Sequence, residues 1–165
     1  MPDFEPVLLA NVGQPDSFTR RVYEQRGGYQ ALRKVLKSSA PKEVIETVKS
    51  SGLRGRGGAG FPTGLKWTFL PPNHPGPIYF CLNADESEPG TFNNRILMED
   101  DPHQVLEGLI LSCFATQARN ACSSHAPGMS HPPKKSVVTM AHTVTTLAYS
   151  AMKKKENFIA LYSVW

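Results

Sequence analysis

The clearest hydrophobic pattern in the chain lies between residues 101 and 114, where apolar side chains recur every three or four positions. The apolar positions are Val105, Leu106, Leu109, Ile110, Cys113 and Phe114. Asp101 is placed to cap the amino terminus of this segment, Pro102 suits the first helical turn, and Gln104 completes a capping-box pattern with Asp101. The pattern therefore predicts a helix with one apolar face.

Two shorter helices and one strand are predicted ahead of it. After the Gly27-Gly28 break, helical spacing relates Tyr29, Leu32, Val35 and Leu36. A second helix is predicted from Pro41, with Gly52 as its stop. Its apolar face consists of Val44, Ile45 and Val48. The run 78–82 is short, apolar and rich in aromatic residues, which is typical of a buried strand.

The segment from Gly52 to Trp67 carries the first candidate chemistry. It contains Arg54, Gly55, Arg56, Gly57, Gly58, Gly60, Gly64 and Lys66. Glycine permits positive φ and close approach of the backbone to a ligand, and consecutive N–H groups can form a concavity that binds anions. Basic side chains add charged contacts suited to phosphate. The segment matches neither G-x-G-x-x-G nor the P-loop, so the residues alone leave open a phosphate-bearing ligand or a structural glycine-rich turn.

An acidic segment, Asn83-Ala-Asp-Glu-Ser-Glu-Pro-Gly90, follows the predicted strand. The end of that strand brings polar side chains to the rim of a sheet, where open α/β folds bind ligands. These side chains are Asn83, Asp85, Glu86 and Glu88. Together with the glycine-rich segment they predict a nucleotide-cofactor pocket, and the alternative is an acidic surface turn.

Four blocks of the chain, in this order, resemble the flavoprotein NADH-binding subunit of respiratory complex I. They are Gly27–Arg33, Ser51–Trp67, Asn83–Phe92 and Asp101–Gly108. Diaphorase subunits of NAD-reducing hydrogenases and beta subunits of NAD-dependent formate dehydrogenases are similar to the same blocks. The resemblance implies an α/β fold, a fragment of the family's FMN-binding domain with helices packed on a small, partly parallel sheet.

The resemblance also implies a function and its residues. The function is oxidation of NADH by FMN, with electrons passing to iron–sulfur centres and on to quinone. The positions implied for FMN are Gly55, Arg56, Gly57, Gly58, Gly60, Lys66, Asn83, Asp85 and Glu86. Those implied for NADH are Phe61 and Phe69, as aromatics that sandwich the adenine, and Glu88. Core packing is the alternative for the two phenylalanines, and no side chain is expected to act as an acid or base.

Implied partners are other peripheral-arm subunits of complex I, above all the small [2Fe–2S] subunit, at the inner, cytoplasmic face of the plasma membrane. Nucleic acid is not expected, because residues 1–115 hold 12 basic and 13 acidic side chains, whereas 116–165 hold 6 and 1. The Lys153–Lys155 cluster is interpreted as a solvated face. No apolar stretch approaches 18 residues, so no transmembrane helix is expected, and the start of the chain does not resemble a signal peptide.

The chain is expected to divide into an extended lead-in at 1–17, a family-like part at 18–121 and an atypical tail at 122–165, frameshifted or poorly ordered. The family's [4Fe–4S] ligands are expected to be missing, because Cys81, Cys113 and Cys122 lie 32 and 9 residues apart. Zinc at Cys122-x-x-His125 lacks half of a ligand set, and His103 is expected to form a local hydrogen bond. Three functions stay open: a complex I subunit, a hydrogenase or formate dehydrogenase diaphorase, or a catalytically silent fragment.

Overall fold

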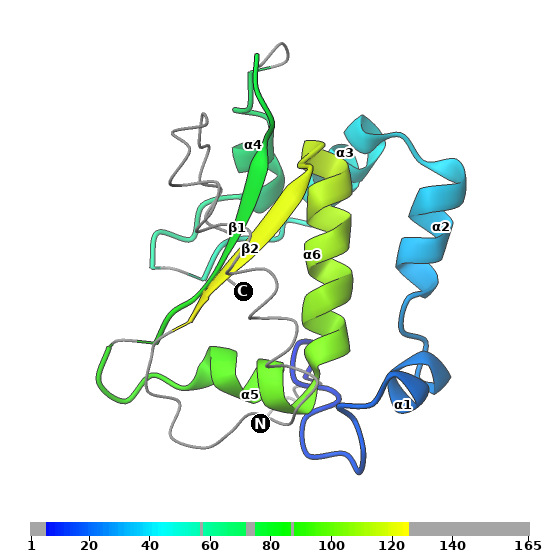
Figure 1. Ribbon diagram of the computed structural model, residues 1–165, viewed down its shortest axis with the longest axis vertical. Coiled ribbons are helices and arrows are strands. Elements are labelled where there is room, and N and C mark those ends of the chain that lie inside the picture. Colours follow the sequence, from blue (N-terminus) through cyan, green and yellow to red (C-terminus); the bar gives the residue numbers. More distant parts are fainter. Residues whose placement is uncertain (1–5, 57, 72–74, 87, 126–165) are drawn as a thin grey trace.

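The computed structural model describes residues 6–56, 58–71, 75–86 and 88–125 of the 165-residue chain. Figure 1 shows the helices and strands formed by these residues. In chain order they are α1 (Arg20–Gln25), α2 (Gln30–Ser38), α3 (Pro41–Ser50), α4 (Thr63–Trp67), β1 (Tyr79–Ala84), α5 (Asn93–Asp100), α6 (Pro102–Thr116) and β2 (Asn120–His125).

The two strands pair in parallel, with Tyr79 opposite Asn120 at one end and Ala84 opposite His125 at the other. The chain reaches β2 from β1 through α5 and α6, as parallel strands require a crossover. The strand predicted at 78–82 is confirmed and runs two residues further, to Ala84. Parallel strands covered by helices confirm the α/β prediction, with the sheet limited to two strands among the described residues.

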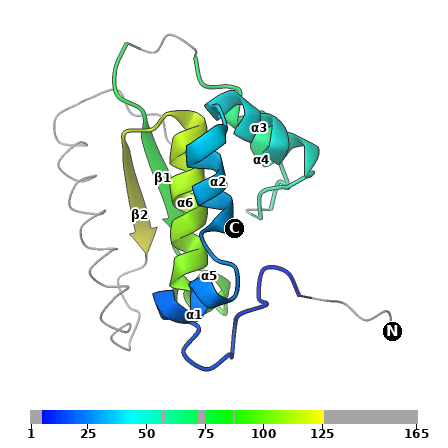
Figure 2. The ribbon, with the colours of Figure 1, turned by 90° about the vertical axis from the view of Figure 1, so that its right-hand side faces the viewer.

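Helix α6 is the centre of the molecule. It packs against both strands on one side and against α1, α2, α3 and α5 elsewhere, as the two ribbon views show (Figures 1 and 2). The core cluster consists of Val44, Trp67, Phe80 and Ala115, with Leu109, Cys113 and Phe114 packed against it. Because α6 has neighbours on several sides, its buried positions include Glu107, Ser112 and Thr116 outside the predicted apolar face, whereas Ile110 is 39% exposed.

Only one of the two hydrogen bonds of the predicted capping box is present at the amino terminus of α6. The Asp101 side chain accepts the N–H of Gln104 at 3.4 Å, and Pro102 is the first helical residue. The reciprocal half of the capping box is wrong, because the Gln104 side chain donates to the carbonyl oxygen of Leu8 at 3.0 Å. Residues 7–18 bring that carbonyl close by folding into consecutive turns, where an extended lead-in was expected.

The helices predicted after Gly28 and from Pro41 are confirmed as α2 and α3. Gly52 ends α3 with φ at +70°, a conformation that favours glycine at helix ends. Three helices, α1, α4 and α5, were not predicted. The segment from Cys122 to His125 was expected to lack regular structure and instead forms the second part of β2. Pairing with buried β1 outweighs the weak strand propensity of that segment.

Candidate functional site

The glycine-rich loop is closed at its base by backbone hydrogen bonds. Gly55 N–H donates to the carbonyl oxygen of Phe61 at 2.9 Å, and Thr63 N–H donates to that of Leu53 at 2.9 Å. At the tip, Gly58 has φ of +91° and Gly60 has φ of +58°, and a Cβ atom at either position would meet nothing within 4 Å. The backbone of the tip is therefore open to an approaching ligand. Gly57 lies outside the described residues.

The basic side chains of this loop fold back on its own backbone. The Arg54 guanidinium donates to the carbonyl oxygen of Gly60 at 3.1 Å, and that of Arg56 donates to the carbonyl oxygen of Arg54. Both arginines are exposed. They brace the loop and place positive charge beside the open tip, which is the arrangement that an anionic ligand requires.

Helix α4 ties the loop to the core and carries Lys66. Trp67 is 6% exposed and belongs to the main core cluster. Gly64 faces α3 so closely that a Cβ atom there would lie 2.6 Å from the backbone nitrogen of Lys49. The absence of a side chain at Gly64 therefore lets the two helices touch, and this contact fixes α4, which carries half-buried Lys66.

The acidic loop begins at the end of β1 and is also ordered by its own contacts. The Asn83 Oδ1 atom accepts the N–H of Asp85 at 3.0 Å. The Glu86 Oε1 atom accepts the N–H of Asn94 at 2.6 Å and that of Arg95 at 3.3 Å, at the start of α5. Asp85 and Glu86 are half-buried and Glu88 is exposed. The resemblance implied a flavin contact for Glu86, and because α5 was not predicted, the bond that holds this side chain was missed.

Phe61 and Phe69 lie together at the foot of the glycine-rich loop. Their ring centroids are 5.8 Å apart with the planes tilted by 55°, and the two residues are 42% and 64% exposed. An aromatic ring between them would need two ring contacts in series, each about 4.5–7 Å between centroids. In this arrangement the two rings contact each other and leave no space for an adenine between them.

A small pocket lies under the acidic loop, against α5 and α6. It is lined by Leu82, Asn83, Ala84, Asn94, Leu97, Met98 and Val105. Its volume of about 10 Å³ is room for about one water molecule. A flavin ring does not fit in this pocket.

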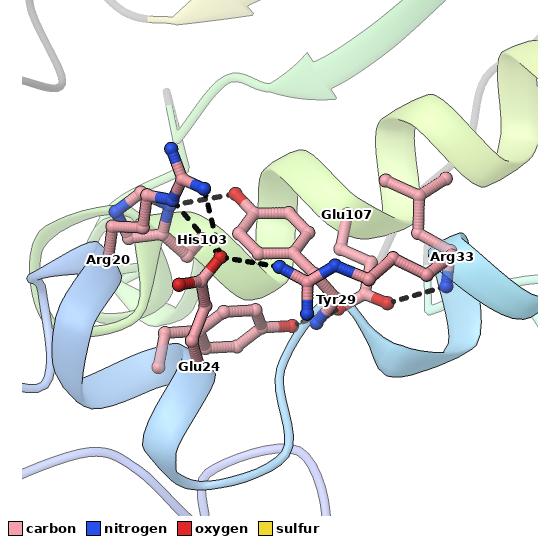
Figure 3. Close-up of polar contacts among 8 residues, drawn as sticks. Arg20, Glu24, Tyr29, Arg33, His103 and Glu107 are labelled. Atoms are coloured by element: carbon pink, nitrogen blue, oxygen red, sulfur yellow. Dashed lines mark hydrogen bonds and ion pairs between the residues drawn. The ribbon is translucent and has the colours of Figure 1, made fainter.

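A buried polar cluster that the sequence did not reveal lies on the opposite side of α6 from the strands (Figure 3). Glu107 is 7% exposed. Its carboxylate accepts the Tyr23 hydroxyl at 2.6 Å, the Tyr29 N–H at 2.7 Å and the Leu32 N–H at 3.0 Å. The signal that could have found it is a glutamate in the middle of an otherwise apolar helix, where a carboxylate has to find donors elsewhere in the fold.

His103 lies beside this cluster. Its Nδ1 atom is 2.8 Å from the Tyr29 hydroxyl oxygen, 74 positions away in sequence, so the prediction of a local partner is wrong. Burial lowers the pKa of His103 and raises the pKa of the Tyr23 and Tyr29 hydroxyls. Burial also raises the pKa of the Asp101 carboxyl, although the Asn11 amide donates to it at 2.7 Å.

Two kinds of feature are absent from the described residues. They contain no group of three or more His, Cys, Asp and Glu side chains able to hold a metal ion. In the same part of the chain, no helix has both the length and the apolar character needed to cross a membrane. The side chains of Cys122 and His125 are not described, and His131 lies outside the described residues.

Comparison with known proteins places these loops in a family context. The sequence profile of the family described as Nuo51 FMN-binding domain matches residues 48–148. An NADH-quinone oxidoreductase subunit of Rhizobium meliloti is 58% identical over 118 residues, which cover 72% of this chain and 28% of that protein. The corresponding subunit of Aquifex aeolicus is 54% identical over 115 residues, covering 70% and 26%. That of Streptomyces coelicolor is 43% identical over 154 residues, covering 93% and 33%.

A solved structure is also similar. The crystal structure of NAD⁺-reducing [NiFe]-hydrogenase in the air-oxidized state matches with a TM-score of 0.58 and 27% sequence identity. The match covers 97% of this chain and 24% of that one. The chain thus spans between about a quarter and a third of the length of the proteins that it matches.

Proposed function

The chain belongs to the Nuo51 FMN-binding domain family, and we propose on that basis that its glycine-rich and acidic loops form part of a site for FMN and NADH. The whole protein would then oxidise NADH through FMN and pass electrons to iron–sulfur centres and quinone. The observation that carries the proposal is the open tip of the glycine-rich loop, where Gly58 and Gly60 have positive φ and no atom lies within 4 Å of a Cβ position at either glycine.

The residues present fit the phosphate and polar edge of a flavin nucleotide. The exposed backbone of the loop tip and the Arg56 charge suit an anionic group. Lys66 adds a cation from α4, and Asn83 and Asp85 bring polar atoms from the end of β1. When bound, FMN supplies hydride acceptance and single-electron release. The contribution of the described side chains is to bind and orient it.

For NADH, the exposed aromatic surface is the supporting feature. Phe69 is 64% exposed, so part of its ring surface is available for adenine although the ring also contacts Phe61. Glu88, exposed in the acidic loop, is able to accept hydrogen bonds from hydroxyl or amide groups of the dinucleotide. The adenine then stacks on one face of the pair, in place of the sandwich expected from the resemblance.

The relatives named above are subunits of NADH-quinone oxidoreductase, which supports placing this chain in a multisubunit complex. Its neighbour would be the small [2Fe–2S] subunit, and its location the inner face of the plasma membrane, on the cytoplasmic side. The second candidate, a hydrogenase diaphorase, is favoured by the similarity to the NAD⁺-reducing hydrogenase structure. The identity of 58% to the Rhizobium meliloti protein, against 27% to the hydrogenase, favours the first candidate.

The division of the chain at residue 121 stays a prediction, and so does an out-of-frame origin of the tail. The match to the family profile extends to residue 148, beyond that boundary. Reading the genomic DNA downstream of codon 121 in all three frames tests the out-of-frame origin. One uninterrupted frame, with the same tail in close relatives, contradicts it.

Quenching of FMN fluorescence by the full 165-residue chain tests the cofactor site. Lys66→Ala removes a charged contact worth about 1.5–3 kcal/mol, so the FMN dissociation constant should rise at least about tenfold. Gly58→Val should block the loop tip. Gly13→Val is the matched control, because Gly13 has φ of +77° and equally open surroundings in the amino-terminal turns.

Equal FMN affinity in the parent chain, Lys66→Ala and Gly58→Val would contradict the assignment of the loop. A parent chain that is folded by circular dichroism and binds no FMN would favour the catalytically silent alternative. Loss of affinity in Gly13→Val as large as that in Gly58→Val would show that the effect is one of folding.

A further inference from the structure

Glu86 occupies a place that a capping residue usually fills. The first N–H groups of a helix have no acceptor within the helix. In α5 these include the N–H groups of Asn94 and Arg95, and the preceding residue, Phe92, makes no side-chain cap. The Glu86 Oε1 atom accepts both N–H groups, at 2.6 and 3.3 Å. A carboxylate at this end of a helix is also favoured by the helix dipole.

The chain between Glu86 and α5 is a closed loop. After Ser87, which the structure does not describe, Thr91 N–H donates to the carbonyl oxygen of Glu88 at 3.1 Å. Gly90, in the third position of this turn, has φ of +81°, and Pro89 in the second position suits the same type II turn. The Glu86 carboxylate, at the beginning of this loop, binds the backbone at the start of α5, where the loop ends.

Helix α5 is itself fixed in the core, so the loop is fastened to a rigid support. Leu97 is 5% exposed and Met98 is 9% exposed. Met98 packs against Ala84 at the end of β1, and α5 packs against α6. Helix α5 therefore contacts the acidic loop at two points. Met98 packs against Ala84, where the loop leaves β1, and the backbone at the start of α5 binds the Glu86 carboxylate.

We propose that Glu86 is a positioning residue of the cofactor site, which sets the acidic loop against α5 and so directs Asp85 and Glu88. This inference rests on the proposed function. It differs from the role implied by the resemblance, because Glu86 acts here through the backbone of Asn94 and Arg95. Both bonds go to one carboxylate oxygen, Oε1, so the geometry of the loop depends on the placement of that atom.

Two readouts on the same variants test the inference in the full chain. The first is amide hydrogen exchange at Asn94 and Arg95, measured by NMR, and the second is FMN affinity. Glu86→Ala should speed exchange at both amides about tenfold, the typical effect of losing a charged cap, and should weaken FMN binding. Glu86→Gln keeps an acceptor oxygen and should restore most of the protection and part of the affinity.

Glu43→Ala is the matched control. Glu43 is another glutamate at a helix start, and its carboxylate accepts the Ala40 N–H at 2.8 Å in α3. Its loss should open the start of α3 and leave both the Asn94 amide and FMN affinity unchanged.

Three results would overturn the inference, and they differ from one another. Weaker FMN binding in Glu86→Ala with unchanged Asn94 exchange means that Glu86 contacts the ligand directly. Faster exchange with unchanged FMN affinity means that the cap does not shape the site. If the parent chain binds no FMN, the proposed function fails and the positioning role fails with it, while the exchange data still decide whether Glu86 caps α5.

Discussion

Two glutamates of this molecule perform the same task in different surroundings. Glu107 accepts backbone N–H groups at the start of α2, and Glu86 does so at the start of α5. Glu107 is 7% exposed and also accepts the Tyr23 hydroxyl at 2.6 Å, whereas Glu86 is half-buried and accepts through Oε1. The same type of contact can therefore stabilise a fold or position a loop, depending on burial and on the number of donors.

The largest effect is expected at the buried member of the pair. Glu107→Ala leaves one hydroxyl and two N–H groups without their acceptor in the interior, at about 1–3 kcal/mol each when no water replaces it. We expect a loss of about 3–5 kcal/mol in the free energy of unfolding, measured by urea denaturation. Glu46→Ala is the control, since Glu46 is exposed and forms a surface ion pair with Lys49. A loss below about 1 kcal/mol in Glu107→Ala would contradict the structural role.

A second substitution tests the packing that brings donors to Glu107. A Cβ atom at Gly28 would lie 2.1 Å from the Tyr23 ring, so Gly28→Ala has to displace that ring from its place beside Tyr29. Overpacking of this kind costs about 1–3 kcal/mol. The measurement is thermal and urea unfolding, with Ser38→Ala on the exposed end of α2 as a control. Unchanged stability would mean that Tyr23 moves without affecting the carboxylate.

A smaller, pH-dependent effect is expected from His103. Burial lowers its pKa below the ordinary value of 6.5, and the neutral imidazole can accept the Tyr29 hydroxyl. The unfolded chain therefore takes up the proton first as pH falls through 6.5, and the unfolding free energy should decrease until the pKa of the folded state is passed. The raised pKa of Asp101 acts in the opposite sense, favouring the folded state as pH falls.

His103→Gln separates the two contributions, because glutamine keeps an acceptor for Tyr29 and does not titrate. Urea denaturation between about pH 7.5 and 5.5 should give a flatter pH dependence for the variant than for the parent chain. If the stability of the variant and of the parent chain changed with pH in parallel, His103 would not be the cause of the pH dependence. Asp101 and the other histidines are present in both chains. Their contributions therefore cancel in the difference between the two free energies of unfolding, as far as the substitution leaves these groups unchanged.

The smallest effect on stability is expected for Glu24, whose carboxylate lies at the surface beside the cluster around buried Glu107. Glu24 accepts from Arg33 at 2.7 Å and from Arg20 at 3.1 Å, as Figure 3 shows. The hydrogen bond from Arg20 is the main cause that lowers the pKa of the Glu24 carboxyl, and the charges of Arg20 and Arg33 lower it further. Solvent screens such exposed ion pairs, so they contribute little to stability. Glu24→Gln should leave the urea midpoint unchanged within error at about 0.15 M salt, and a clear downward shift would contradict this.

The sequence predicted elements that carry their own local signals. Pro102 and the apolar spacing after it were sufficient for α6, and Pro41 and Gly52 bounded α3. The missed elements depend on distant partners. The cap of α5 comes from Glu86, eight positions before Asn94, and β2 has little strand character of its own and depends on β1.

In the candidate site, too, the sequence predicted local features and missed contacts between distant segments. Positive φ at Gly58 and Gly60 agrees with what glycine suggests locally. The contact between Phe61 and Phe69 and the use of Glu86 as a cap could not be predicted, because each depends on how separate segments meet in space. Which ligand atoms the loop residues contact stays a prediction.

The parallel pairing of β1 with β2 has a consequence for how the chain folds. The two strands cannot align until α5 and α6, which lie between them in the chain, have returned the chain to its starting edge. Such non-local pairing requires loop closure before any strand contact is gained, and it slows folding relative to helix formation. In refolding experiments the helical signal should therefore appear before burial of Phe80, and substitutions in β2 should mainly change the unfolding rate.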